Sequence, residues 1–293
     1  MPIHYQERDA AFIDYHPWRI LESPRFFIRG PQLDPEDLGR GNYFSLVGAA
    51  ETVGVHAQEP YGAILAKRLN IPCLNLGKGG AGVAFFSRPE MGEIVARVNR
   101  GRFLILTFMS GRQTGNSLIR PIDGTCQCLY QGEEMAVERA WALITDAHWH
   151  DRELLTRLVR EVREGYAGEY AGFLALVRVP VILLYFSQRQ PRYDINWQKK
   201  HRSSLWSQFP QFVNDDVVGE VLAAAAGRVS YAECVSRRGI PYVLRDASGR
   251  VIPIWYGEEH GSRPRQSYYP SAEMHQDAAA ALEPLCRGIL AAG

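Results

Sequence analysis

The chain has 293 residues, of which 46% are hydrophobic and 22% are charged, as in an ordinary folded domain. Lys and Arg total 33 against 32 Asp and Glu, and the resulting net charge of +1 argues against a general nucleic-acid-binding protein and against a charged disordered chain. No apolar run reaches the roughly 20 residues that span a membrane, no apolar signal segment is visible, and the five cysteines are scattered. We therefore expect a cytoplasmic protein that binds neither nucleic acid nor membranes, and its oligomeric state stays open.

Residues 1–40 show no clear periodicity, and Pro17, Pro24, Pro31 and Pro35 interrupt them. Prolines at this density interrupt regular helices and strands. The segment is therefore expected to be an N-terminal arm that wraps a single core domain formed by residues 41–293.

The core domain alternates predicted strands with predicted helices. Short apolar runs predict strands at 43–47, 71–76, 102–108 and 179–186, while residues 228–235 fit either a fifth strand or the start of a helix. Helical spacing of apolar residues favours helices at 59–69, 89–98, 133–145, 151–163, 217–226 and 271–290. This alternation predicts an α/β fold, a three-layer sandwich with a mainly parallel, flavodoxin-like sheet.

Two segments depart from this alternation. Residues 187–214 are polar and aromatic with little periodicity, so they are expected to form a lid-like loop, in which aromatic rings would either stack on a sugar or pack on the core. Residues 242–254 contain an Asp-Ala-Ser-Gly turn between short apolar runs, which predicts a small hairpin. Neither Cys126-x-Cys128 nor His148-x-His150 has the spacing of a zinc site, so no metal is expected.

Ligands of such folds bind at the carboxyl ends of the strands, and this rule selects the loops that could hold a site. The loop after the first strand begins with Gly48-Ala49-Ala50-Glu51-Thr52. The loop after the second strand, Asn75–Gly82, is rich in glycine and contains Gly77 and Lys78. Its backbone N–H groups could approach an anion, although a tight turn between strand and helix explains the glycines as well.

The later loops supply polar donors and a possible base. Arg112, Gln113 and Asn116 follow the third strand, and Arg189 follows the fourth, where it could clamp a carboxylate, phosphate or sulfate. At the start of the last helix, Glu273 and His275 follow a Pro-Ser pair, and a histidine beside a cleft can act as a general base.

These loops together resemble the SGNH (GDSL-like) hydrolases, and nearly the whole chain looks like an uncharacterised bacterial family of SGNH-like proteins. The resemblance implies an SGNH-type sheet, a catalytic role for His275, and oxyanion-stabilising roles for the amide of Gly77 and the side chain of Gln113 or Asn116. The chain departs from the family where Gly48-Ala49-Ala50 stands in place of Gly-Asp-Ser, so that Ala50 replaces the usual nucleophile and Thr52 is the next hydroxyl. Glu273 precedes His275 by two residues, whereas the family has an aspartate three residues before its histidine.

Three functions follow as hypotheses. The first is an ester hydrolase or acyltransferase acting on a saccharide or small metabolite, with Glu51, Thr52 or a water activated by His275 in place of the serine. The second is a direct group transferase without a bound cofactor, whose acyl-CoA or sulfonucleotide donor lies along Gly77–Gly82 and meets Lys78, Arg112 and Arg189. The third is a non-catalytic protein that binds a glycan or an anion in the same cleft.

Overall fold

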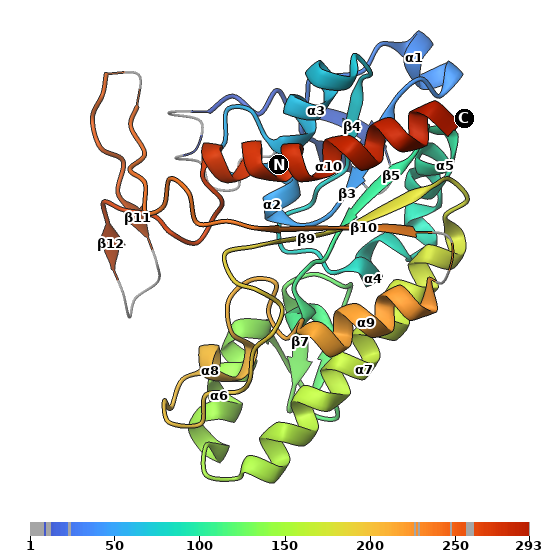
Figure 1. Cartoon of the computed structure of the whole chain (residues 1–293). Coiled ribbons are helices and arrows are strands. Elements are labelled where there is room, and N and C mark those ends of the chain that lie inside the picture. The colour runs from blue at the N-terminus through green and yellow to red at the C-terminus, as the bar shows by residue number, and fades with distance from the viewer. Residues whose placement is uncertain are drawn as a thin grey trace.

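A five-stranded parallel sheet forms the centre of the molecule (Figure 1). The computed structural model describes residue 9 and residues 13–22, 25–225, 227, 229–246, 248–255 and 261–292. The strands are β3 (Phe44–Val47), β4 (Cys73–Asn75), β5 (Leu104–Thr107), β9 (Val181–Ser187) and β10 (Val229–Val235), and their order across the sheet is β10-β9-β5-β3-β4. This is the flavodoxin-like order, so the predicted fold class is confirmed and residues 229–235 are a strand.

Helices cover both faces of the sheet. One face packs against α3 (Tyr61–Leu69) and α10 (Ala272–Ala292), and the other against α4 (Val83–Phe86), α5 (Gly92–Arg100), α7 (Arg152–Leu176) and α9 (Asp215–Ala224). Every residue of β3, β5 and β9 is buried. This double coverage explains why these strands are continuous apolar runs rather than alternating patterns.

A smaller lobe is inserted between β5 and β9. It contains an antiparallel sheet of β6 (Ile119–Pro121), β7 (Gln127–Tyr130) and β8 (Glu133–Ala136), together with α6 (Val137–His148) and the first half of α7. Helix α8 (Arg202–Trp206), from the chain between β9 and β10, packs on this lobe. Trp141, Leu155 and Leu158 are among the buried residues of the lobe's own core.

The lobe contains the main departures from the sequence prediction. Residues 133–136 form a strand and not the start of a helix, because they pair with β7 before the chain enters α6. Helix α7 continues to Leu176 rather than ending near residue 163, because Tyr166, Tyr170 and Phe173 extend its buried face onto the central sheet. Outside the lobe, the short helix α2 (Ala50–Val53) forms where the sequence predicted a loop.

The described part of the N-terminal segment packs on the core. It contains the strand pair β1 (Trp18–Leu21) and β2 (Phe26–Ile28) and the helix α1 (Pro35–Arg40). Arg29 donates hydrogen bonds of 2.8–3.0 Å to the carbonyl oxygens of Val53, Gly54, Ala57 and Gln58. These bonds tie the arm to the loop after α2, and the domain boundary at residue 40 remains a prediction.

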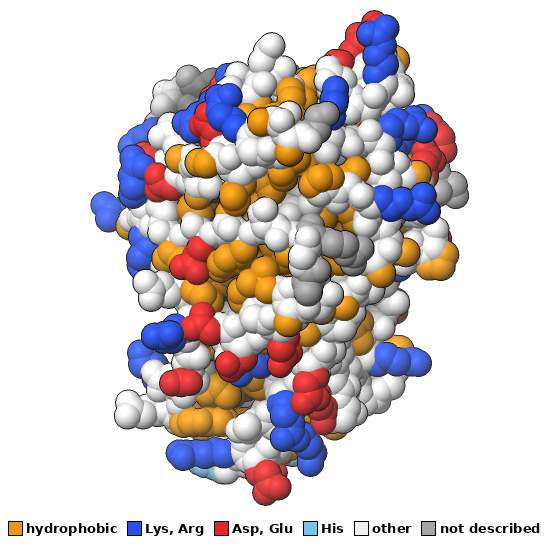
Figure 2. Space-filling view, turned by 45° about the vertical axis from the view of Figure 1, so that its right-hand side comes forward, with side chains coloured by type: hydrophobic (Ala, Val, Ile, Leu, Met, Phe, Trp, Pro, Cys, Tyr) orange, Lys and Arg blue, Asp and Glu red, His pale blue; other side chains and the backbone are white. Residues whose placement is uncertain are grey.

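The predicted hairpin forms only near its turn. Arg245 bridges Val251, whereas Tyr242 pairs with Gln266 and β11 (Ile254–Trp255) pairs with β12 (Ser262–Arg263). Among the described residues, no helix is long and apolar enough to cross a membrane. Figure 2 shows basic and acidic side chains interspersed on one face of the molecule, with apolar side chains between them, in keeping with the balanced charge of the chain.

Candidate active site

Two adjoining cavities open at the carboxyl ends of the strands. The lid cavity, of about 400 Å³, lies between the sheet, the 187–214 segment and residues 267–274. The strand-end cavity, of about 260 Å³, lies between the loops that follow β3, β4 and β5. Four residues line both cavities: Glu51, Arg112, Phe209 and Tyr268. The rule that ligands bind at the carboxyl ends of parallel strands therefore selects this region.

Glu51 is the buried carboxyl group of the site. It lies in α2, only 3% of its surface is exposed, and its Oε2 atom has no hydrogen-bond partner. Burial raises the pKa of Glu51 to about 7, partly opposed by its own backbone amide and by Arg112. A carboxyl group with this pKa, facing a cavity, can take up and release a proton at neutral pH.

Arg112 forms the boundary between the two cavities. Its guanidinium group lies 2.7 Å from Oε1 of Glu138, and its Nε donates to Ser110 Oγ at 3.1 Å. A longer contact of 3.5 Å joins Arg112 to the hydroxyl of Tyr268. These contacts fix the guanidinium group while it still lines both cavities, so Arg112 is a preorganised cation.

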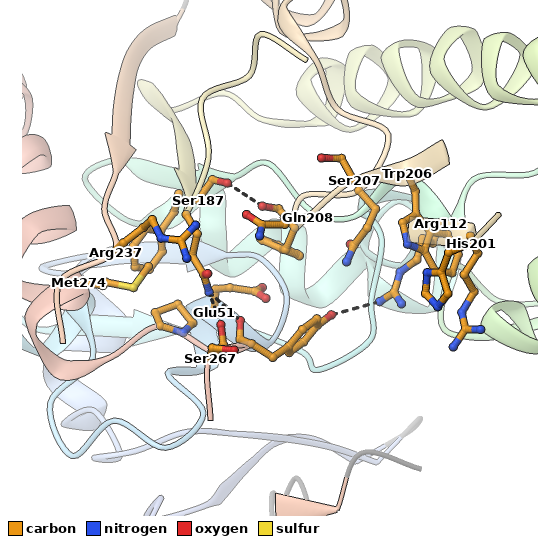
Figure 3. Close-up of a pocket in the computed structure, with 17 residues that line it drawn as sticks. Glu51, Arg112, Ser187, His201, Trp206, Ser207, Gln208, Arg237, Ser267 and Met274 are labelled. Atoms are coloured by element: carbon orange, nitrogen blue, oxygen red, sulfur yellow. Dashed lines mark hydrogen bonds between the residues drawn. The ribbon is translucent and has the colours of Figure 1, made fainter. Parts of the chain in front are cut away.

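The rest of the lid cavity is basic and aromatic. Trp206 lies under two guanidinium groups, with Arg112 at 5.4 Å and Arg202 at 6.0 Å from its ring centroid. Figure 3 shows Arg112, His201 and Trp206 at one end of this cavity and Glu51, Arg237 and Met274 toward the other. Arg202 and Arg237 have no carboxylate partner among the described residues, so the cavity favours a ligand that carries negative charge.

Some of the residues predicted around the first loop line a cavity, and others are packed in the core. Ala50 lines the strand-end cavity beside Glu51. Thr52 is fully buried, and its hydroxyl bonds to Tyr61 at 3.1 Å and to Thr107 at 2.9 Å, so it does not reach a ligand. Gly48 is a packing residue, because a Cβ there would lie 2.0 Å from Thr52 Oγ1.

The glycine-rich loop contributes Gly80 and Ala81 to the strand-end cavity, and not Gly77. The amide of Gly77 already bonds to Asn75 Oδ1 at 3.0 Å, so it is not available to an oxyanion. Lys78 lines a third cavity on the other side of the loop. The expected meeting of Lys78, Arg112 and Arg189 in one cleft is therefore wrong.

Of the donors predicted after β5, Gln113 lines the strand-end cavity and leaves its buried Oε1 without a partner. Asn116 lines neither cavity, and its Oδ1 accepts hydrogen bonds from the amides of Leu118 and Ile119, each at 2.9 Å. Arg189 donates to the carbonyl oxygens of Gln208, Pro210 and Val213 at 2.9–3.2 Å. It organises the lid segment from within and does not contact either cavity.

His275 lies in the core between α10 and α3, where none of its surface is exposed. Its Nδ1 accepts a hydrogen bond of 3.3 Å from the amide of Tyr61. Burial, and then the charge of Arg29, lower the pKa of His275 to about 3. The histidine is therefore neutral and packs behind Phe186 of the lid cavity, and it does not line a cavity itself. The nearby Glu273 is exposed and lines none of the cavities described here.

Several cavity residues were not among the predicted site residues. Gly80 lay inside a loop that the sequence singled out, and Trp206 and Phe209 belong to the aromatic segment whose rings were expected either to stack on a ligand or to pack on the core. Cys126 and Glu138 come from the inserted lobe, and nothing local in the sequence signals their approach to the site. Among the described residues, no group of three or more His, Cys, Asp or Glu side chains is placed to hold a metal ion.

Comparisons with known proteins give a family model and similar folds. A model described as a domain of unknown function (DUF6473) matches residues 3–120. No curated protein matches the sequence. An acetyl xylan esterase from the rumen bacterium Butyrivibrio proteoclasticus is 14% identical with a TM-score of 0.43, over 91% of this chain and 67% of that one.

Two further solved structures are similar at the same level. A family two carbohydrate esterase from Clostridium thermocellum, in complex with cellohexaose, is 9% identical with a TM-score of 0.44, over 92% of this chain and 68% of that one. A protein of the G-D-S-L family from Desulfitobacterium hafniense is 12% identical with a TM-score of 0.35, over 82% of this chain and 99% of that one. Identities this low, with TM-scores below 0.5, do not indicate a shared activity.

Proposed function

We propose that the two adjoining cavities bind a small ester with an anionic or saccharide part, and that Glu51 acts as the general base in its hydrolysis or acyl transfer. The observation that carries this proposal is the position of Glu51, a buried carboxyl group with a free oxygen and a pKa of about 7 on the wall of both cavities. A base with a pKa near the ambient pH is the most effective in proton transfer.

The reaction would proceed without a covalent enzyme intermediate. The Glu51 carboxylate takes a proton from a water or an acceptor hydroxyl while that oxygen attacks the acyl carbon. The C–O bond of the ester then breaks, and the proton on Glu51 passes to the leaving alcohol. Arg112 supports this scheme because a fixed guanidinium group can stabilise the negative charge that develops on the acyl oxygen.

A side-chain nucleophile has little support from the cavity walls, since burial raises the pKa of the Cys126 thiol and hydrogen bonds occupy two of the serine hydroxyls. The hydroxyl of Ser110 accepts hydrogen bonds from Arg112, and the hydroxyl of Ser187 donates to the carbonyl oxygen of Phe209 at 2.6 Å. Ala50 has no nucleophile, while Thr52 and His275 are both buried. The same observations favour a second candidate, in which the cavities bind an anionic saccharide without turning it over.

Acyl release from acetylated neutral and acidic sugars, followed by NMR, tests the proposal. Glu51→Gln should lower the rate by at least about 100-fold, as expected for loss of a general base, and intact mass should show no acyl-enzyme. Glu90→Gln is the matched control, because Glu90 is exposed and lines no cavity described here.

Two results would speak against catalysis by Glu51. Turnover that survives Glu51→Gln within a few-fold would remove Glu51 as the base. Absence of turnover, together with saturable calorimetric binding of an acidic sugar that Arg112→Gln weakens, would instead establish the binding function.

A further inference from the structure

A third cavity, of about 390 Å³, lies on the far side of the glycine-rich loop from Glu51. We call it the arm cavity, because the arm residues Arg25 and Phe26 form one wall. The loop residues 78–80 form a second wall, and residues 85–91 and 123–127 close the remainder. It shares only Gly80 and Cys126 with the strand-end cavity.

The charged groups of the arm cavity are three cations and one carboxylate. Arg25, Lys78 and Arg88 face a single acid, Asp123. Asp123 uses its Oδ1 to accept hydrogen bonds from the backbone and hydroxyl of Thr125, and its Oδ2 lies 3.9 Å from Arg88. Neither Arg25 nor Lys78 has a carboxylate partner among the described residues, so the cavity holds an excess of positive charge.

The backbone of the loop adds donors to these cations. Lys78 donates its amide to Gly48, and Ala81 donates its amide to Lys78. Between them, the amides of Gly79 and Gly80 have no acceptor within the described chain, and both residues line the cavity. Gly80 has a φ of +77°, and a Cβ there would lie 2.7 Å from Cys126 Sγ, so this conformation requires glycine. Backbone amides in such a loop suit an anion with several acceptor oxygens.

The opposite wall of the cavity is aromatic. The rings of Phe26 and Phe85 are 5.9 Å apart, and the guanidinium group of Arg88 lies 4.6 Å above the ring of Phe85. The Nε atom of Arg88 is buried and has no hydrogen-bond partner. An unsatisfied buried donor beside an aromatic surface indicates a ligand with an acceptor group and an apolar or planar body.

We propose that the arm cavity binds the phosphate ester of a small organic molecule. The phosphate would contact Lys78, Arg88 and the amides of Gly79 and Gly80, while its organic part rests on Phe26 and Phe85. This site is separate from the cavities of Glu51, so the proposal does not depend on the proposed function.

Calorimetric titration of the full chain tests the site with four probes. These are adenosine 3′,5′-bisphosphate, glucose 6-phosphate, inorganic phosphate and, as the uncharged match, adenosine. We expect at least one phosphate ester to bind and adenosine to bind at least about tenfold more weakly, since hydrogen bonds between charged groups stabilise a complex more than neutral ones. Tighter binding of adenosine 3′,5′-bisphosphate than of glucose 6-phosphate would indicate that the aromatic wall contacts a nucleobase.

The variants Lys78→Ala and Arg88→Gln should each weaken binding of that ester by about tenfold or more. Lys67→Ala is the matched control, because Lys67 is exposed, pairs with Glu59 and lies outside the cavity. Among the described residues the side chain of Lys78 has no hydrogen bond or ion pair, so its variant is expected to fold. Equal binding by wild type and both cavity variants would overturn the proposal, as would the absence of any phosphate binding at millimolar concentration.

Alkylation of Cys126 by iodoacetamide gives a second readout. Cys126 lines the arm cavity and is partly exposed. The phosphate ester should slow alkylation of Cys126, measured by peptide mass spectrometry, whereas adenosine at the same concentration should not. The same protection in Lys78→Ala would place the ligand in another cavity and contradict the assignment.

Discussion

Two buried ionisable side chains near the carboxyl edge of the sheet respond to burial in opposite directions. Burial disfavours the charged form of each group, so it raises the pKa of Glu51 to about 7 and lowers the pKa of His275 to about 3. At neutral pH Glu51 therefore exchanges a proton readily, whereas His275 stays uncharged. The proton chemistry of the site belongs to the carboxyl group and not to the imidazole.

Glu51 should make the protein less stable as the pH rises. The unfolded chain releases this proton near pH 4.5 and the folded chain near pH 7, so the contribution of Glu51 to stability falls across that interval. Glu51→Gln removes this pH-dependent contribution. The difference in the free energy of unfolding, variant minus wild type, should therefore rise by about 2 kcal/mol from pH 5 to pH 8. Urea unfolding at both pH values measures the difference, and a change equal to that of Glu90→Gln would contradict it.

His275 should act in the opposite sense. The unfolded chain takes up a proton near pH 6.5 and the folded chain only near pH 3, so stability is present above pH 6.5 and is lost on acidification. His275→Asn should be less stable at pH 7 by about 1–3 kcal/mol, because a buried hydrogen bond is disturbed. It should also lose less stability than wild type between pH 7 and pH 5 in urea unfolding. If a substrate is found, turnover that disappears in a folded His275→Asn protein would restore a catalytic role for the histidine.

Sequence position identifies the candidate loops but not the direction of their side chains. Glu51, Arg112 and Gln113 were predicted and do line the cavities. Asn116 and Arg189 follow strands just as closely, yet backbone groups bind the Oδ1 of Asn116 and the terminal guanidinium nitrogens of Arg189. Which residues face a ligand depends on these local bonds, which a single sequence does not reveal.

At the scale of elements, the 187–214 segment depends on one internal cation. The guanidinium group of Arg189 donates to four carbonyl oxygens of the segment and lies 4.0 Å above the ring of Tyr193. Its donors hold the chain around Phe209, which lines both cavities. The lid is therefore an ordered wall of the site.

Arg189→Met should release this wall. The change removes the hydrogen bonds of Arg189 to four exposed or part-buried carbonyl oxygens, and we expect a loss of stability of about 3 kcal/mol. Limited proteolysis should cut within residues 188–214 sooner than in wild type. Arg192→Met is the control, because Arg192 is 90% exposed and pairs only with Asp215 in the described chain, and equal cleavage of the two variants would refute the role of Arg189.

Strands β3, β5 and β9 were predictable because each is an apolar run covered on both faces. Strand β10 has exposed residues at Glu233 and Val235, so its sequence fitted a strand or the start of a helix. The strands β6, β7 and β8 place exposed side chains beside buried or half-buried ones and form no continuous apolar run. Pairing with one another and packing in the lobe hold them in place, and a local window of sequence contains neither contribution.

At the scale of the whole molecule, α7 joins two hydrophobic cores. Its first half contributes Leu155 and Leu158 to the lobe, and its second half contributes Tyr170 and Phe173 to the core below the sheet. The hydroxyl of Tyr170 also bonds to the backbone of Thr107 and Met109, each at 2.8 Å, at the start of the loop that carries Arg112. We expect the lobe and the sheet to unfold together.

Leu158→Ala should therefore shift a single calorimetric transition. Loss of a fully buried leucine side chain lowers stability by about 2–5 kcal/mol. Leu176→Ala, in the same helix but 42% exposed, should have an effect below about 1 kcal/mol. Two separate transitions, of which only one moves in Leu158→Ala, would show that the lobe unfolds independently.

The pairing of Arg112 with Glu138 has an evolutionary consequence. Arg112 follows a strand of the sheet, whereas its carboxylate partner belongs to a lobe inserted between β5 and β9. A change in the inserted lobe can therefore reset the charge that Arg112 presents to a ligand while the sheet and its loops keep their sequence. Ligand preference in related chains can then diverge by exchange or remodelling of one insertion, as a module separate from the scaffold that supports it.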